Sequence, residues 1–118
     1  MYNNFFRDQN ITILVIICSH PKNFAHREAI RLTWGHEFNN IHLNNSEFHG
    51  QIIFQVGFEE IQPHGINELL KEESEKYGDL LIQDFVEHYN NLTIKTVMLL
   101  KFVNQLTEIP SFIFKVIK

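Results

Sequence analysis

Two arginines and a serine in this sequence have types and spacings suited to binding a phosphate. Arg27 and Arg31 are four residues apart, so they share one face of a predicted helix. Ser19 precedes that helix, at the end of a predicted strand, where open α/β sheets bind their ligands. Two guanidinium groups on one face suit a diphosphate or a carboxylate. The alternative interpretation is a solvated basic face, because Arg31 lies near the end of the helix, where cations are mildly favoured.

A lysine and an aspartate near another predicted helix are further candidates. Lys95 falls in the first turn of that helix, where the helix dipole disfavours a cation by about 0.3–1 kcal/mol. A bound phosphate would reverse this penalty, and Thr96 would add a hydroxyl donor; the alternative is an exposed lysine that leans away from the helix end. Asp84 directly follows a predicted strand, so it either caps a loop or contacts a ligand. Glu87, in the same turn, is interpreted as solvated.

Charge and composition exclude several other classes of function. A formal net charge of −4, without a concentrated basic face, argues against nucleic-acid binding. The seven histidines are scattered and Cys18 is the only cysteine, so the chain has no zinc-ligand spacing and no internal disulfide. Ser19 and His20 have no catalytic triad partner at a local spacing, which argues against a hydrolase. The longest apolar run, 11–18, is shorter than the roughly 20 residues of a membrane-spanning helix.

The hydrophobic pattern predicts a single α/β domain over residues 11–118, after a lead-in segment at residues 1–10. We expect strands at 11–18, 51–56, 80–82 and 112–117, and helices at 24–34, 66–77 and 92–106. Strands that alternate with helices favour a parallel sheet with helices on its faces. The last helix is the most regular, because it has an apolar stripe made of Leu92, Thr96, Leu99, Leu100, Val103 and Leu106.

Glycines mark the expected ends of several elements. Gly35 and Gly78 are predicted to terminate the first two helices, and Gly57 is predicted to end the second strand. Trp34 is interpreted as a residue that anchors the core. The asparagine-rich segment 36–49 is interpreted as an exposed loop.

Three blocks of the sequence occur in an order that chance rarely produces. They are Ile16-Ile-Cys-Ser19 followed by Arg27-x-x-Ile-Arg-x-Thr-Trp-Gly35, then Tyr77-Gly-Asp-Leu-Leu-x-x-Asp-Phe85 followed by Tyr89-x-Asn-Leu-Thr-x-Lys-Thr96, and finally Phe114-Lys-Val116. In this combination, residues 11–116 resemble the N-terminal half of the catalytic domain in the β-1,3-galactosyltransferase-like family of hexosyltransferases. The resemblance implies a Rossmann-like parallel sheet with flanking helices, as a partial GT-A glycosyltransferase fold truncated after the fourth strand.

The resemblance also implies an activity and a place in the cell. Such enzymes are type II Golgi membrane proteins with a single N-terminal anchor, and they transfer galactose or N-acetylglucosamine from a UDP-sugar to a glycan acceptor on a glycoprotein or glycolipid. Asn91 matches a frequent glycosylation position, although it is equally explained as a helix N-cap. Asn10 and Asn44 begin two further Asn-x-Ser/Thr triplets. Carried over by position, the residues expected to bind the donor are Ser19, Arg27, Arg31, Asp84 and Lys95.

The family pattern is incomplete after Val116. Family members continue there with consecutive aspartates that hold Mn²⁺ against the UDP diphosphate, whereas Ile117 and Lys118 follow here and offer no side-chain oxygen ligands. We therefore expect no metal ligands, no general base and no membrane anchor in this chain, and a donor-binding half that is inactive alone. The alternative is a non-catalytic fragment that binds UDP or a partner without turnover. An unrelated α/β nucleotide-binding domain is a third interpretation, although the sequence has no glycine-rich phosphate loop.

The sugar-nucleotide interpretation depends on one spatial prediction. The first and fourth strands must lie side by side, so that a UDP diphosphate rests at their carboxyl ends. The basic side chains of Arg27, Arg31 and Lys95 must then point into one shared pocket. An uncovered sheet edge and uncovered helix faces also predict poor solubility when the chain is expressed alone.

Overall fold

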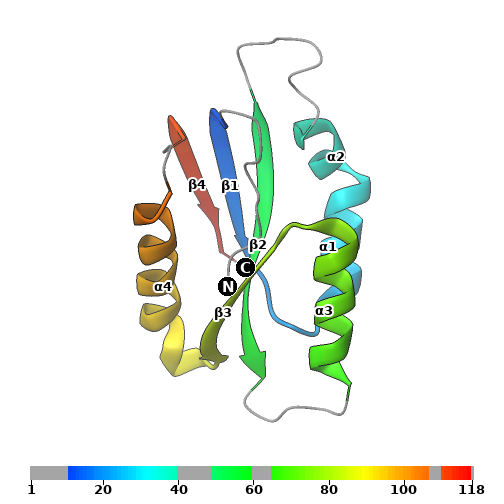
Figure 1. Ribbon diagram of the computed structural model, residues 1–118, viewed down its shortest axis with the longest axis vertical. Helices are drawn as coiled ribbons and strands as arrows, with labels where there is room; N and C mark the ends of the chain where they lie inside the picture. The colour runs from blue at the N-terminus through cyan, green and yellow to red at the C-terminus, as the bar shows by residue number, and fades with distance from the viewer. Residues whose placement is uncertain (1–10, 40–48, 60–64, 107–109, 118) are drawn as a thin grey trace.

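Four parallel strands form the centre of the protein. The computed structural model describes residues 11–39, 49–59, 65–106 and 110–117. Its sheet has the strand order β3-β2-β1-β4 (Figure 1). The neighbouring positions of β1 and β4 confirm the spatial prediction for the first and fourth strands. The strands are β1 Ile13–Cys18, β2 Gly50–Glu59, β3 Leu80–Glu87 and β4 Phe112–Val116.

Helices cover both faces of this sheet (Figure 1). Three of them, α1, α2 and α3, lie on one face, and α4 lies on the other. The predicted α/β class, a Rossmann-like parallel sheet with flanking helices, is therefore confirmed. The bounds are α1 Phe24–Leu32, α2 Trp34–Asn39, α3 Ile66–Tyr77 and α4 Leu92–Asn104, with a short 3-10 helix, η2 Tyr89–Asn91, directly before α4.

The central strand β1 supplies two hydrophobic cores, because alternate side chains of a strand point to opposite faces of the sheet. Val15 and Ile17 join a core that reaches α1 and α3. Leu14 and Ile16 join a second core that reaches α4. Since both faces of the strand are covered, its sequence is a continuous apolar run rather than an alternating one.

β2 and β3 are both longer than predicted. Gly57 lies inside β2 rather than at its end. Val56 lies opposite Ile82, but two residues later the partner on β3 is Val86, so the register shifts between them. A Cβ atom at position 57 would lie 2.6 Å from the carbonyl oxygen of Phe85. Glycine fits this close approach of two backbones, and the prediction that Gly57 ends the strand is wrong.

The chain after α1 also departs from the prediction. Gly35 lies within α2 instead of terminating α1. A Cβ atom at position 35 would be 2.5 Å from the carbonyl oxygen of Ile30. Trp34 begins α2 and is 46% exposed, so its interpretation as a core anchor is wrong. Helix α2 also occupies the start of the predicted loop 36–49. Residues 40–48 and the lead-in 1–10 lie outside the described residues.

The later helices match the prediction in part. Gly78 ends α3 as predicted, in the left-handed conformation with φ of 64°. In α4, however, Leu92 and Leu100 of the predicted stripe are exposed, whereas Lys95 and Leu99 are buried. The helix therefore carries a lysine on its buried face, and that charge requires a partner inside the protein.

Candidate functional site

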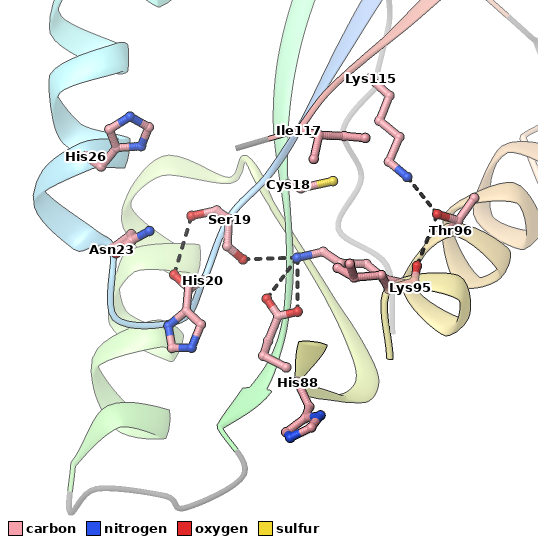
Figure 2. Close-up of a pocket in the computed structure, with 12 residues that line it drawn as sticks. Cys18, Ser19, His20, Asn23, His26, His88, Lys95, Thr96, Lys115 and Ile117 are labelled. Atoms are coloured by element: carbon pink, nitrogen blue, oxygen red, sulfur yellow. Dashed lines mark hydrogen bonds and ion pairs between the residues drawn. The ribbon is translucent and has the colours of Figure 1, made fainter. Parts of the chain in front are cut away.

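A cavity of about 660 Å³ opens at the carboxyl ends of β1 and β4, beside the first turns of α4 (Figure 2). Its volume lies in the range of small-molecule sites, roughly 300–1,000 Å³. It is lined by Ser19, which follows β1, and by Glu87, Lys95 and Lys115 from β3, α4 and β4. The chain builds β2 and β3 on one side of β1 and then places β4 on the other side. Open α/β sheets bind their ligands at such a reversal of strand order.

Arg27 does not line this cavity and is fully buried. Its Nε and Nη2 atoms donate to the two carboxylate oxygens of Glu73, each at 2.7 Å. Nη1 donates to Ser19 Oγ at 2.9 Å and to the His20 carbonyl oxygen at 2.7 Å, and Nη2 donates to the Pro21 carbonyl oxygen at 3.1 Å. All five N–H groups of the guanidinium thus have protein partners. The solvated-face alternative is wrong, and the contacts assign Arg27 to holding the segment after β1 rather than to touching a ligand.

Arg31 is also engaged away from the cavity. Its Nε and Nη2 atoms donate to Asp79 at 2.7 and 2.6 Å, and Nη2 donates to Glu73 at 2.7 Å. The guanidinium lies over the ring of Tyr77, 3.9 Å from its centroid. Burial alone lowers the pKa of Arg31, but hydrogen bonds to the two carboxylates and their charges outweigh it and hold this pKa above its ordinary value. The structure therefore does not bring the arginines into one pocket with Lys95. This part of the spatial prediction is wrong, and the two guanidinium groups give the sugar-nucleotide interpretation no support.

Lys95, in contrast, does reach the cavity (Figure 2). Its Nζ atom lies 2.8 and 3.0 Å from the two carboxylate oxygens of Glu87 and donates to the carbonyl oxygen of Ser19 at 3.4 Å. The Lys95 and Glu87 side chains are each only 9% exposed. An exposed Lys95 and a solvated Glu87 are therefore both ruled out. Contact of Lys95 and Ser19 with a donor stays a prediction.

Among the described residues, Asp84 and Asn91 are predicted site residues that do not belong to the cavity lining. Asp84 is an exposed residue inside β3 and does not line the cavity, so it caps no loop. Asn91 occupies the N-cap position of α4, but its side chain makes no capping bond and donates to the Val86 carbonyl oxygen at 2.9 Å. Glycosylation of Asn91 stays a prediction. Asn10 and Asn44 lie outside the described residues.

Comparison with known proteins decides the family. The sequence model of the family described as Galactosyltransferase matches residues 25–117, most of the chain. The chain belongs to the galactosyltransferase family. UDP-GalNAc:beta-1,3-N-acetylgalactosaminyltransferase 1 of Homo sapiens is 32% identical over 110 residues, which cover 91% of this chain and 31% of that protein. Beta-1,3-galactosyltransferase 1 of Mus musculus is 33% identical over 112 residues, which cover 92% of this chain and 31% of that protein.

These similarities confirm the resemblance drawn from the sequence blocks and the assignment of the chain to the glycosyltransferases. This galactosyltransferase-family chain spans 31% of the length of the curated relatives it matches. Within the ranges that the structure describes, none of the helices has both the length and the apolar character needed to cross a bilayer. The Golgi location and the membrane anchor predicted from the resemblance therefore remain proposals.

Two buried glutamines that the sequence interpretation missed fix α4 against the sheet. The Nε2 atom of Gln55 donates to Gln83 Oε1 at 2.6 Å and to the Lys95 carbonyl oxygen at 2.8 Å. The Nε2 atom of Gln83 donates to the Met98 carbonyl oxygen at 2.9 Å. A signal was available, because a glutamine inside the apolar run of β2 requires a buried hydrogen-bonding partner.

Lys115 is a second cavity cation that the sequence interpretation did not assign to the site. Its Nζ atom donates to Thr96 Oγ1 at 2.8 Å. The positive charges of Lys115 and Lys95 favour the thiolate form of Cys18, which also lines the cavity. Burial raises the pKa of the Cys18 thiol, and the two ammonium groups offset part of that rise. A raised pKa disfavours the thiolate, which is the nucleophilic form of cysteine.

The cavity residues do not fit the Mn²⁺ ion that the family resemblance implies. Among the described lining residues Glu87 is the one carboxylate, and both of its oxygens contact Lys95. Within the same described ranges, no group of three or more His, Cys, Asp or Glu side chains is placed to hold a metal ion. A hard divalent cation requires several oxygen ligands, so no step of the chemistry is assigned to a metal here.

Proposed function

We propose that the cavity binds the UDP moiety of a UDP-sugar and that the described residues form the donor-binding part of a hexosyltransferase. The observation that carries this proposal is the position of the cavity, at the reversal of strand order between β1 and β4. The N-terminal turns of α4 and the ammonium group of Lys115 border it, and both features favour phosphate oxygens. The name of the human relative includes UDP-GalNAc, which supports a UDP-hexose donor for this chain.

Binding rather than proton transfer is the role that these residues support. In sugar transfer an acceptor hydroxyl loses its proton to a general base while UDP departs. The one carboxylate in the described lining, Glu87, is held by Lys95 and is not positioned as a free base. This observation favours a second candidate function, a UDP-binding part without turnover of its own.

The wider biology follows the family and belongs to the same proposal. The acceptor is a glycan on a glycoprotein or glycolipid, and the protein resides in the Golgi membrane as a single-pass type II protein. Fluorescence microscopy of the tagged protein beside a Golgi marker tests the location. A diffuse cytosolic signal would contradict it.

Calorimetric titration of the folded 118-residue chain tests donor binding. UDP should bind more tightly than uridine, because the phosphates meet the cationic part of the cavity. UDP affinity that does not change with Mn²⁺ favours the binding part without turnover, and a requirement for Mn²⁺ favours a catalytic donor site. If a folded chain binds no UDP with or without the metal, the proposed function is wrong.

A further inference from the structure

The charges around the cavity are unevenly matched. With histidines neutral, the charged residues in its described lining are the anion Glu87 and the cations Lys95 and Lys115. Glu87 directs both carboxylate oxygens at the Lys95 ammonium, so this pair is neutral as a unit. One positive charge is left over, and it resides on Lys115.

Lys115 is held in position without being neutralised. It lies on β4 opposite Ile16 of β1 and reaches from the strand to Thr96 on α4 (Figure 2). Thr96 Oγ1 accepts from the Lys115 ammonium at 2.8 Å and donates its own hydrogen to the Leu92 carbonyl oxygen at 3.2 Å. An ammonium group has three N–H donors, and within the described part of the chain Thr96 takes one of those on Lys115.

We propose that Lys115, held by Thr96, is the residue that anchors a phosphate group of the ligand in this cavity. The inference rests on the proposed function, because a nucleoside diphosphate supplies the phosphate. It assigns the principal phosphate contact to a residue of β4 that is not among the five residues expected from the sequence to bind the donor. The Lys115 ammonium, positioned by Thr96, can donate charge-assisted hydrogen bonds to the phosphate. Such bonds are stronger than hydrogen bonds between neutral groups. Lys95 and Glu87 then form an ion pair without net charge that keeps the first turns of α4 in place.

Calorimetric titrations with UDP, inorganic pyrophosphate and uridine test this assignment. The variants are Lys115→Met, which keeps the apolar stem and removes the charge, and Lys115→Arg, which keeps the charge. Lys101→Met is the matched control, because Lys101 is an exposed lysine elsewhere on α4. Lys115→Met should weaken UDP and pyrophosphate binding by about tenfold or more, the loss of one hydrogen bond to a charged group, and leave uridine binding unchanged. Lys115→Arg should retain most of the affinity, and Lys101→Met should match the wild type.

The outcomes separate this inference from the proposed function. If the wild type binds UDP and Lys115→Met binds it equally well, Lys115 is no phosphate anchor and the proposed function stands. If Lys115→Met weakens uridine as much as UDP, the residue shapes the cavity only, and the inference is again wrong. If the folded wild-type chain binds no UDP, both fail. Thermal melts confirm that each variant is folded, and Lys115→Gln replaces Lys115→Met if the latter does not fold.

Discussion

Arg27 on α1 and Glu73 on α3 form a bidentate ion pair in the interior, with both N–O distances at 2.7 Å. The same guanidinium donates to Ser19 Oγ and to the His20 carbonyl oxygen, so the pair connects two helices to the segment that borders the cavity. Glu73 also accepts from Arg31. This carboxylate therefore bridges the buried Arg27 and the partly buried Arg31, which also pairs with Asp79, and it helps to set the position of the cavity edge.

Removal of that carboxylate should strongly destabilise the protein. Glu73→Ala leaves the buried guanidinium of Arg27 without its ion-pair partner, and breaking a buried pair in this way costs about 3–5 kcal/mol. Urea denaturation measures the free energy of unfolding. The matched control is Glu72→Ala, at the exposed neighbouring position, which should change it by about 0.5 kcal/mol or less. Equal effects of the two substitutions would show that the pair contributes nothing specific.

The same pair predicts a loss of stability in acid. Burial alone raises the pKa of Glu73, but hydrogen bonds from Arg27 and Arg31 and their charges outweigh it and lower the pKa below its ordinary value of 4.5. A lowered pKa in the folded state means that the stabilisation is fully present above 4.5 and is lost as the pH falls through the folded-state pKa. Urea denaturation from pH 7 down to pH 3 should show this decline. Glu73→Gln should show a smaller decline than Glu72→Gln, and identical slopes would contradict the assignment.

Lys95 and Glu87 should be energetically coupled, because both are nearly excluded from water and contact each other at 2.8 Å. Lys95→Met and Glu87→Gln each leave one charge without its partner, whereas the double variant leaves none. A double-mutant cycle on the free energy of unfolding should therefore give a coupling energy of about 0.5–3 kcal/mol. Additive effects of the two substitutions would contradict the neutral pair on which the assignment of Lys115 depends.

Gln55 should hold the start of α4 in place. Gln55→Leu removes the donor to the Lys95 carbonyl oxygen and to Gln83 Oε1, and buried groups left without partners cost about 1–3 kcal/mol. The free energy of unfolding measures this cost, and hydrogen exchange of α4 amides should become faster. Gln105→Leu is the control, because Gln105 is exposed at the end of α4. If exchange rates in α4 do not change, the two glutamines do not fix the helix.

The strand order and the place of the cavity were accessible from the sequence because they depend on patterns. Continuous apolar runs mark doubly covered strands, and alternating strands and helices favour a parallel sheet. The chain then returned to place its fourth strand beside the first, as expected. The length of β3 was not accessible. It depends on the shift in pairing beside Gly57, which is a contact between two strands and not a property of either one.

The roles of the arginines could not be predicted from spacing. Two arginines four residues apart on a helix face suit a diphosphate and a buried pair of carboxylates equally well. Their partners, Glu73 and Asp79, lie 46 and 48 positions further along the chain from Arg27 and Arg31, respectively. No local pattern indicates which carboxylates α3 and the start of β3 will present. The arginine side chains indicated that an anionic partner would be bound. Which anion they contact depended on tertiary packing.

The β4 side of the sheet predicts association of the chain at high concentration. Phe112 and Phe114 lie opposite Ile13 and Val15, on the face that α1 and α3 cover elsewhere, yet they are 56% and 55% exposed. Contiguous exposed aromatic side chains on a strand at the edge of the described sheet promote contact between molecules.

Sedimentation velocity should show association of the wild type that increases with concentration. The double variant Phe112→Thr/Phe114→Thr should associate less, and threonine keeps a high preference for strands. Leu32→Thr, at an exposed position on α1, is the control and should behave like the wild type. A wild type that stays monomeric at every concentration would show that these phenylalanines do not cause self-association.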